Sequence, residues 1–152
     1  MKTSNKKTQY ITPKKEDIER RFDEYNEKYF DGVLPKCKIS VTKSKYNASA
    51  FICKYSSKVN KIYIANDVYW TDENLKLTLI HEMVHHYVWE IMNLNPFFVH
   101  GTSFRKVCRM LRKKHGLRVN LWELPSDHWK GKRKASPLKE MMLRFLSFVL
   151  PL

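Results

Sequence analysis

The stretch His81-Glu82-Met83-Val84-His85 decides the fold, because it sets two histidines four residues apart with a glutamate beside the first. On a helix, residues at positions i and i+4 share one face with their Cβ atoms about 6 Å apart, so two imidazoles can hold one metal ion. A catalytic zinc site takes three protein ligands and keeps a fourth position for water. The stretch therefore predicts half of a metal site, and a third ligand must come from another part of the chain.

The residues around this stretch predict an amphipathic helix. Thr71 or Asp72 can cap its start, and Asp72 and Glu73 lie where the positive end of the helix dipole favours acids. Apolar residues then recur every three or four positions, which indicates one buried face. The residues of this face are Leu75, Leu79, Ile80, Met83, Val84, Tyr87, Val88 and Ile91. The helix should stop between Asn93 and Pro96. Buried histidines without a partner would cost free energy, so a shared metal explains them better than an ordinary core.

Four other side chains have suitable chemistry for the third ligand but are placed less well: Glu90, His86, His115 and His128. Glu90 follows His81 by nine residues, a rotation near 180° on a helix, so it faces away. His86 is turned about 100° from its neighbour and lies on the flank. His115 precedes a glycine and should end a later helix, whereas His128 lies in a polar, basic stretch.

His100 is placed best for this role. Asn95-Pro96 should break the first helix, and residues 100–104 then begin a second helix that can lie beside it. We therefore expect His100 to complete the site. Three histidines suit zinc, and manganese, cobalt and nickel are the alternatives for the same ligand set.

Three blocks of the chain together resemble the signature segments of the SprT-like (Spartan-type) zinc metalloproteases. These blocks are Tyr29 to Pro35, Leu79 to Tyr87 and His100 to Phe104, in the order that the family has. The resemblance covers about residues 12–120 and implies a zinc ion held by His81, His85 and His100. It also implies that Glu82 is the catalytic acid and base, and that substrates are proteins at or near DNA, including proteins crosslinked to it.

One family feature is not expected in this sequence. SprT-like proteins often continue into a C-terminal zinc ribbon with paired cysteines. The cysteines of this chain are Cys37, Cys53 and Cys108, and no two of them have the spacing of such a pair. The chain should therefore lack the ribbon and the part of the nucleic-acid contact that the family assigns to the ribbon.

Peptide hydrolysis at such a site needs a group that moves a proton, and Glu82 is placed for this task. As the helical neighbour of His81 it projects next to both histidines, so it can reach the attacking water without ligating the ion. Zinc lowers the pKa of its bound water to about 7 and polarises the scissile carbonyl, while the glutamate passes the proton to the leaving amine. A solvated surface glutamate is the weaker interpretation in this apolar part of the chain.

The rest of the chain predicts an α+β, zincin-like single domain. An N-terminal helix should begin at Thr12-Pro13 and end at Asp31-Gly32. Its buried side should consist of Ile18, Phe22, Tyr25 and Tyr29. Three strands are expected at Cys37–Thr42, Ala48–Tyr55 and Lys61–Ala65, with a hairpin turn at residues 56–60. The following two helices would carry the histidine pair and, at the start of the second, the third ligand.

The strands should form a small antiparallel sheet. An exposed edge strand can hold an extended peptide by main-chain hydrogen bonds, which would place a scissile bond over the metal with little side-chain selectivity. The alternative is that all three strands only pack against the helices.

Four segments are expected along the chain: a flexible basic arm at residues 1–11, the metalloprotease domain at residues 12–130, a basic linker at residues 131–136 and a C-terminal amphipathic helix at residues 137–152. The last segment is too short and too interrupted by charges to span a bilayer. Docking against the domain or self-association is the first interpretation of this helix. A partner groove or a membrane surface is the alternative.

Charge is the second strong signal. The chain has 29 Lys and Arg against 15 Asp and Glu, a formal net charge of +14, and much of the excess lies between Gly101 and Lys134. Such a density favours nonspecific phosphate contacts, so we expect DNA binding with single strands favoured. The candidate residues are Arg112, Lys113, Lys114, Lys130, Lys132, Arg133 and Lys134. Trp122 and Trp129 are expected either to stack on bases or to pack against the domain. A solvated basic face without a partner is the alternative.

Three functions remain open at this point. The first is a zinc endopeptidase that acts at or near DNA. The second is a general metallopeptidase whose basic surface binds acidic protein substrates or keeps the protein in solution. The third is a metal-stabilised binding module that does no chemistry. An intact Glu82 argues against the third, because a structural zinc site needs no base. The sequence shows no secretory signal and has an odd number of cysteines, so the cytoplasm is expected, with the nucleoid or a eukaryotic nucleus as the place of action.

Overall fold

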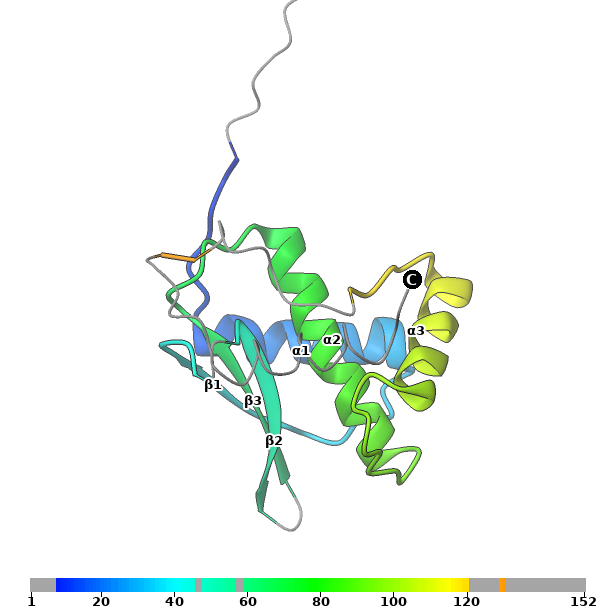
Figure 1. The fold of residues 1–152 in the computed structure, drawn as a ribbon. Helices are drawn as coiled ribbons and strands as arrows, with labels where there is room; N and C mark the ends of the chain where they lie inside the picture. The colour runs from blue at the N-terminus through cyan, green and yellow to red at the C-terminus, as the bar shows by residue number, and fades with distance from the viewer. Residues whose placement is uncertain (1–7, 46–47, 57–58, 121–128, 131–152) are drawn as a thin grey trace, which may run out of the picture.

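The computed structural model describes residues 8–45, 48–56, 59–120 and 129–130. Within these residues, three helices and three strands follow one another in an α+β arrangement, as predicted (Figure 1). The elements are α1 (Lys15–Phe30), β1 (Lys38–Thr42), β2 (Ala50–Ser56), β3 (Val59–Ala65), α2 (Asp72–Glu90) and α3 (Thr102–His115). No helix in this described part is long and apolar enough to cross a membrane.

Several sequence-based expectations fall outside the described residues. They concern most of the basic arm at residues 1–11, the linker at 131–136, the C-terminal helix at 137–152, and the side chains of Trp122, His128, Lys132, Arg133 and Lys134. The hairpin turn expected at residues 56–60 is too long, because β2 extends to Ser56 and β3 already begins at Val59.

The strands form one sheet in the order β1-β3-β2, so the last strand in the sequence is the central one (Figure 1). β2 is antiparallel to β3, whereas β1 runs parallel to β3. The prediction of an antiparallel sheet is therefore wrong for β1. β3 takes the centre because its alternate residues Ile62 and Ile64 are fully buried. The hairpin makes β2 antiparallel to β3, but the direction of β1 depends on the connection that follows it, which strand patterns do not reveal.

The core lies between one face of the sheet and the helices. Ile39 of β1 and Ile62 and Ile64 of β3 point to this side, where α1 passes behind the sheet and α2 runs beside it (Figure 1). The buried residues of α1 include Ile18, Phe22, Tyr29 and Phe30. The opposite face of the sheet carries polar and aromatic side chains and has no helix of the described chain over it.

The start of α1 differs from the prediction. Its N-cap residue is Lys14, which makes no side-chain capping bond, so the expected cap at Thr12-Pro13 is wrong. The reason is that Ile11 pairs with Trp70 in an isolated antiparallel bridge, which keeps the segment before the helix extended. The predicted end is confirmed, because Asp31 and Gly32 both have positive φ angles, of 57° and 69°.

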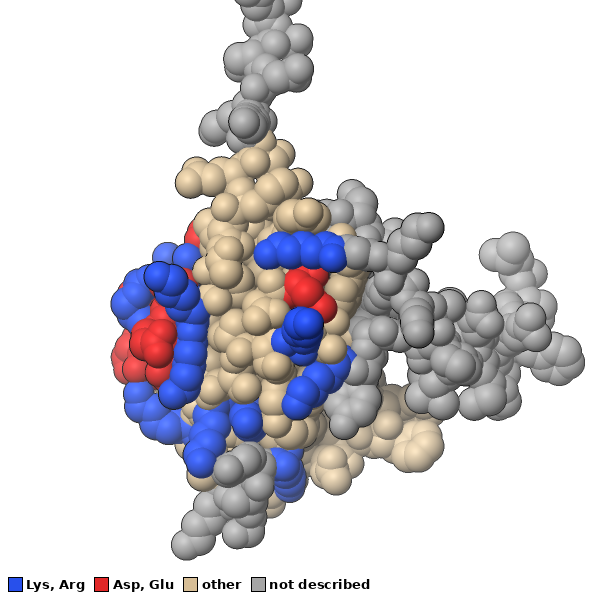
Figure 2. All heavy atoms as spheres, turned by 90° about the vertical axis from the view of Figure 1, so that its left-hand side faces the viewer, with Lys and Arg blue, Asp and Glu red and all other residues tan. Residues whose placement is uncertain are grey.

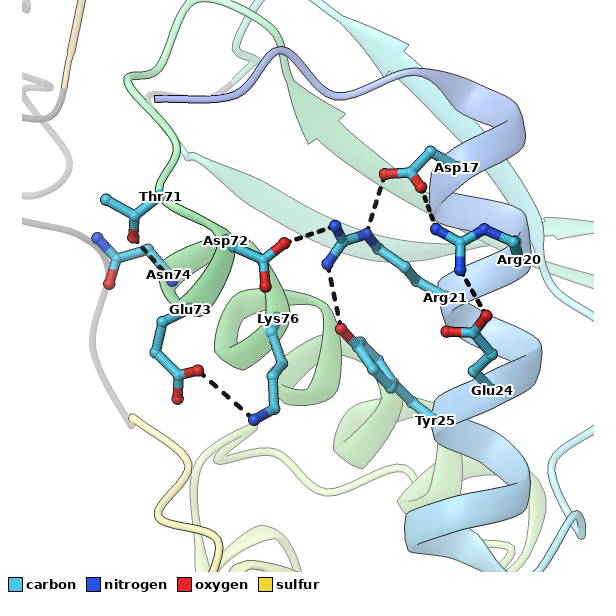
Figure 3. A network of polar contacts seen from close by, with 10 residues as sticks. All are labelled: Asp17, Arg20, Arg21, Glu24, Tyr25, Thr71, Asp72, Glu73, Asn74 and Lys76. Atoms are coloured by element: carbon cyan, nitrogen blue, oxygen red, sulfur yellow. Dashed lines mark hydrogen bonds and ion pairs between the residues drawn. The ribbon is translucent and has the colours of Figure 1, made fainter. Parts of the chain in front are cut away.

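The start of α2 is capped and tied to α1. Thr71 is the N-cap residue, and its hydroxyl accepts a hydrogen bond of 3.1 Å from the backbone N–H of Asn74. Arg21 of α1 donates to Asp72 at 2.6 Å and to Asp17 at 2.9 Å, with Tyr25 on the same guanidinium (Figure 3). Only 15 % of the Arg21 side chain is exposed but 68 % of the Asp72 side chain is, so this contact between the two helices is only partly shielded from water.

The buried face of α2 follows the predicted pattern over most of its length. Leu75, Leu79, Ile80, Met83 and Val84 are fully buried. Ile91 was expected to belong to this face, but it is 41 % exposed because α2 ends at Glu90.

Candidate metal centre

Three imidazoles converge on one point between α2 and α3. His81 and His85 lie one turn apart on α2, and His100 lies two residues before α3 begins. Their Nε2 atoms are separated by 3.2 Å (His81 to His85), 3.1 Å (His85 to His100) and 3.0 Å (His81 to His100). These separations are close to the ~3.3 Å edge of a tetrahedron with zinc–nitrogen bonds of 2.0–2.1 Å. The donor set therefore fits a metal ion with three nitrogen ligands.

The protonation of these rings also suits metal binding. Burial lowers the pKa of His81 to about 4 and that of His85 to about 3, and it lowers the pKa of His100 as well. All three imidazoles are therefore neutral at pH 7. The backbone oxygen of Asn120 lies 2.6 Å from Nδ1 of His81, so this nitrogen donates a hydrogen and Nε2 keeps its lone pair for the ion.

Phe104 forms a floor beneath the three histidines. It lies on the first turn of α3 and is fully buried. Its ring centroid is 4.9 Å from that of His81, 4.5 Å from that of His85 and 4.8 Å from that of His100. Sequence reasoning placed this residue in a signature block but missed its role, because apolar spacing alone marks it only as a core residue of α3.

Among the described residues, these histidines are the one set of His, Cys, Asp and Glu side chains that could hold a metal ion together. A model of the SprT-like family matches residues 18–123, which is more than half of the chain. The chain belongs to the SprT-like family. A comparison with curated proteins found no match. Membership of this family, together with the three histidines, indicates a metallopeptidase-like function.

Glu82 of this SprT-like protein is buried on α2, directly after His81. Only 5 % of the residue is exposed, so the interpretation as a solvated surface glutamate is wrong. Its carboxylate is therefore held away from bulk water, one residue after His81 on the same helix.

The other candidate ligands serve the structure instead. His86 is buried, and its Nε2 donates to the backbone oxygen of Pro35 at 2.9 Å. Its Nδ1 accepts from the side-chain amide of Asn60 at 2.9 Å, and the same amide donates to Glu90 at 2.8 Å. This network joins α2 to β3 and to the segment after α1. His115 ends α3, as predicted, and packs edge-on against Tyr29.

The described basic candidates do not form one patch. Arg112, Lys113 and Lys114 lie exposed on the last turn of α3, where Lys114 pairs with Asp31 at 2.6 Å. The segment 129–130 (orange in Figure 1) lies on the other side of the molecule from α3, and the backbone N–H of Lys130 donates to the backbone oxygen of Asp67. The sequence suggested one concentrated patch because these residues are close in number. Residues that are close in number need not be close in space, and the structure separates these.

Trp129 does not offer its ring to a nucleic acid. It pairs with Val68 in an isolated bridge and is only 9 % exposed. The stacking role considered for Trp129 is therefore wrong, and the packing interpretation holds, because a base needs an accessible ring face.

Proposed function

We propose that this protein is a zinc-dependent endopeptidase that cleaves proteins at or near DNA. The observation that carries the proposal is the convergence of three neutral imidazoles, two of which lie on the helix that also carries the buried Glu82. When bound, zinc would act as a Lewis acid on water and on the scissile carbonyl. His81, His85 and His100 would hold it.

The proton transfers of the reaction fall to Glu82. Its carboxylate would take a proton from the attacking water and later give it to the leaving amine nitrogen, so that the peptide ends as a free acid and a free amine. After the two transfers, Glu82 is again an unprotonated carboxylate. Phe104, on the first turn of α3, would keep the ligand rings in place while the substrate changes.

An edge of the sheet would hold the substrate in this proposal. β1 and β2 are both edge strands, and β2 is the one that packs against α2. A polypeptide added beside β2 would be held by main-chain hydrogen bonds, so many unfolded sequences would be accepted.

The base is tested by Glu82→Gln, with Glu73→Gln on the first turn of the same helix as the matched control. Glu73 is exposed and lies away from the histidines. We expect Glu82→Gln to keep the metal and the fold while cleavage of an unfolded protein falls by about 10²–10⁴-fold. Metal content, circular dichroism and a gel-based cleavage assay give the three readouts. Equal activity of the two variants would exclude Glu82 as the base.

The DNA part of the proposal rests on the net charge of +14 and on the family resemblance. We infer that DNA-protein crosslinks are one substrate class and that the protein acts where DNA is, in a nucleoid or nucleus. The test is cleavage of a DNA-binding protein with and without single-stranded DNA. Cleavage that needs both Glu82 and DNA supports the proposal, whereas cleavage indifferent to DNA indicates a general metallopeptidase. No cleavage in either case would favour the metal-stabilised binding module.

A further inference from the structure

We propose that the helix-free face of the sheet binds single-stranded nucleic acid through a pair of stacked aromatic rings with lysines around them. We call this the sheet face and define it by Lys38, Lys45, Phe51, Lys61 and Tyr63. The proposal deepens the proposed function by naming where nucleic acid binds, and it rests on that function only for its biological purpose, since binding here needs no hydrolysis.

The strand register brings these residues together. Lys38 of β1 is opposite Lys61 of β3, and Phe51 of β2 is opposite Tyr63 of β3. Side chains alternate along a strand, so Lys61 and Tyr63 point away from the side that buries Ile62 and Ile64. The sheet face is thus the side that α1 and α2 leave uncovered.

The two rings form a preorganised platform. Phe51 and Tyr63 are stacked, with centroids 4.5 Å apart and planes inclined by 14°. Both are only half-buried, and both stand on hydrogen-bonded strands. Because every base has a flat π-face, a rigid aromatic surface of this kind accepts bases of any sequence.

Lysines surround this platform. The ammonium groups of Lys45 and Lys61 lie 4.8 and 4.6 Å from the centroid of the Tyr63 ring. These ammonium groups lie next to the ring on which a base would stack. The lysines could therefore contact the phosphate of a nucleotide while the ring contacts its base. Cations over one ring also repel each other, and a phosphate would relieve that repulsion.

The charge around the platform is one-sided. Figure 2 shows this side of the molecule, where basic side chains spread over the surface with a single acidic patch among them. At the left edge of the view, by contrast, basic and acidic side chains are mixed. Of the exposed lysines, Lys43 and Lys45 have no carboxylate partner in the described chain. The carboxylate of Asp67 is already engaged by the backbone N–H and hydroxyl of Ser44, at 2.8 Å each. Excess positive charge of this kind attracts a polyanion.

The partly exposed rings of Phe51 and Tyr63 distinguish a single strand from other polyanions as the ligand of this face. A duplex keeps its bases stacked inside, and an acidic peptide has no bases, so neither would use the Phe51 and Tyr63 rings. DNA and RNA single strands share the necessary chemistry, and both are included in the test as oligo(dT) and oligo(rU).

The experiment measures oligonucleotide binding by fluorescence anisotropy over a salt series, with zinc-loaded, full-length Glu82→Gln protein so that hydrolysis plays no part. The charge variant is Lys45→Gln with Lys61→Gln. Its matched control is Lys15→Gln with Lys28→Gln on α1, since Lys28 also lies over a tyrosine ring. Loss of two phosphate contacts should reduce the slope of log K against log salt by about 1.4, and the control should change it much less. Equal changes in the two pairs would overturn the proposal.

The aromatic variant is Tyr63→Leu, which keeps the charge. We expect about tenfold weaker binding of oligo(dT) and oligo(rU), with duplex binding unchanged. Equal weakening for duplex, or competition by polyglutamate as strong as by oligo(dT), would overturn the single-strand assignment. As a test that needs no change to the sheet, photocrosslinking with 5-iodouracil oligonucleotides should label residues 50–63. Crosslinks confined to α3 would reject the sheet face while leaving the peptidase proposal intact.

Discussion

At the scale of single residues, the candidate metal centre depends on what surrounds each histidine. The Asn120 oxygen orients His81, burial keeps all three rings neutral, and Phe104 packs beneath them. His86 is the immediate neighbour of His85, yet its hydrogen bonds to Pro35 and Asn60 make it a structural residue. Identical side chains next to each other in the sequence therefore have different roles.

The first prediction concerns the third ligand. We expect His100→Ala to lower zinc occupancy, because two histidines alone give an incomplete site, and to lower stability in zinc because ligand binding contributes to folding. The control is His115→Ala, which removes a histidine that ends α3 outside the cluster. Metal analysis after dialysis gives the readout. Full occupancy in His100→Ala would show that the ligand lies elsewhere.

The second prediction concerns the floor of the site. Phe104→Leu should weaken metal affinity by about 10–100-fold, because the rings lose the surface that positions them, while unfolding free energy falls by only ~1 kcal/mol. Phe30→Leu is the matched control, since Phe30 is equally buried but packs against Tyr87. Chelator competition and urea unfolding measure the two effects. Similar metal affinities in both variants would show that Phe104 acts only as a core residue and does not position the metal ligands.

At the scale of elements, the connection between α2 and α3 brings the third histidine to the pair. α2 ends at Glu90, Asn93 takes a positive φ of 51°, and the chain returns to His100 just before α3. Gly101 makes this return possible. A Cβ atom there would lie 2.9 Å from the backbone oxygen of Phe98, closer than such atoms normally approach.

The third prediction follows from this close approach. Gly101→Ala should push the connection apart, cost about 1–3 kcal/mol of stability and weaken metal binding, because His100 is the adjacent residue. The control is Gly116, which lies after α3 with a φ of 66° and with open space around an added Cβ atom. Gly116→Ala should lower the free energy of unfolding by about 1–2 kcal/mol through backbone strain alone and leave metal affinity unchanged. Thermal unfolding and zinc titration separate the two, and unaltered zinc binding in Gly101→Ala would contradict this account.

At the scale of the whole molecule, the candidate metal centre joins two helices that are otherwise linked through the core. A metal that binds only the folded chain stabilises it by mass action, about 2.7 kcal/mol at a hundredfold excess over Kd. We therefore predict that removal of zinc lowers the melting temperature by about 5–10 °C. The loss should be reversed by added zinc and should also occur in Glu82→Gln, which keeps all three ligands. An unchanged melting temperature after verified metal removal would contradict this.

The sequence by itself determined the helices, the strands and the histidine pair. Hydrophobic spacing, the Thr71 cap and the glycine after Asp31 are local signals, so α1, α2 and α3 appear close to their predicted positions. The pair at His81 and His85 follows from helical geometry alone. His100 was also selected correctly as a neighbour of the pair, because the break at Asn95-Pro96 limits where the chain can go.

Only the tertiary structure decided how these pieces meet. The parallel pairing of β1, the Ile11 to Trp70 bridge that delays α1, and the burial of Trp129 all depend on contacts between residues far apart in the sequence. The same holds for the stacked rings of Phe51 and Tyr63, which strand register alone brings together. Local patterns report which backbone conformation a segment prefers, whereas strand direction, burial of a given ring and shared sites follow from the packing of the whole chain.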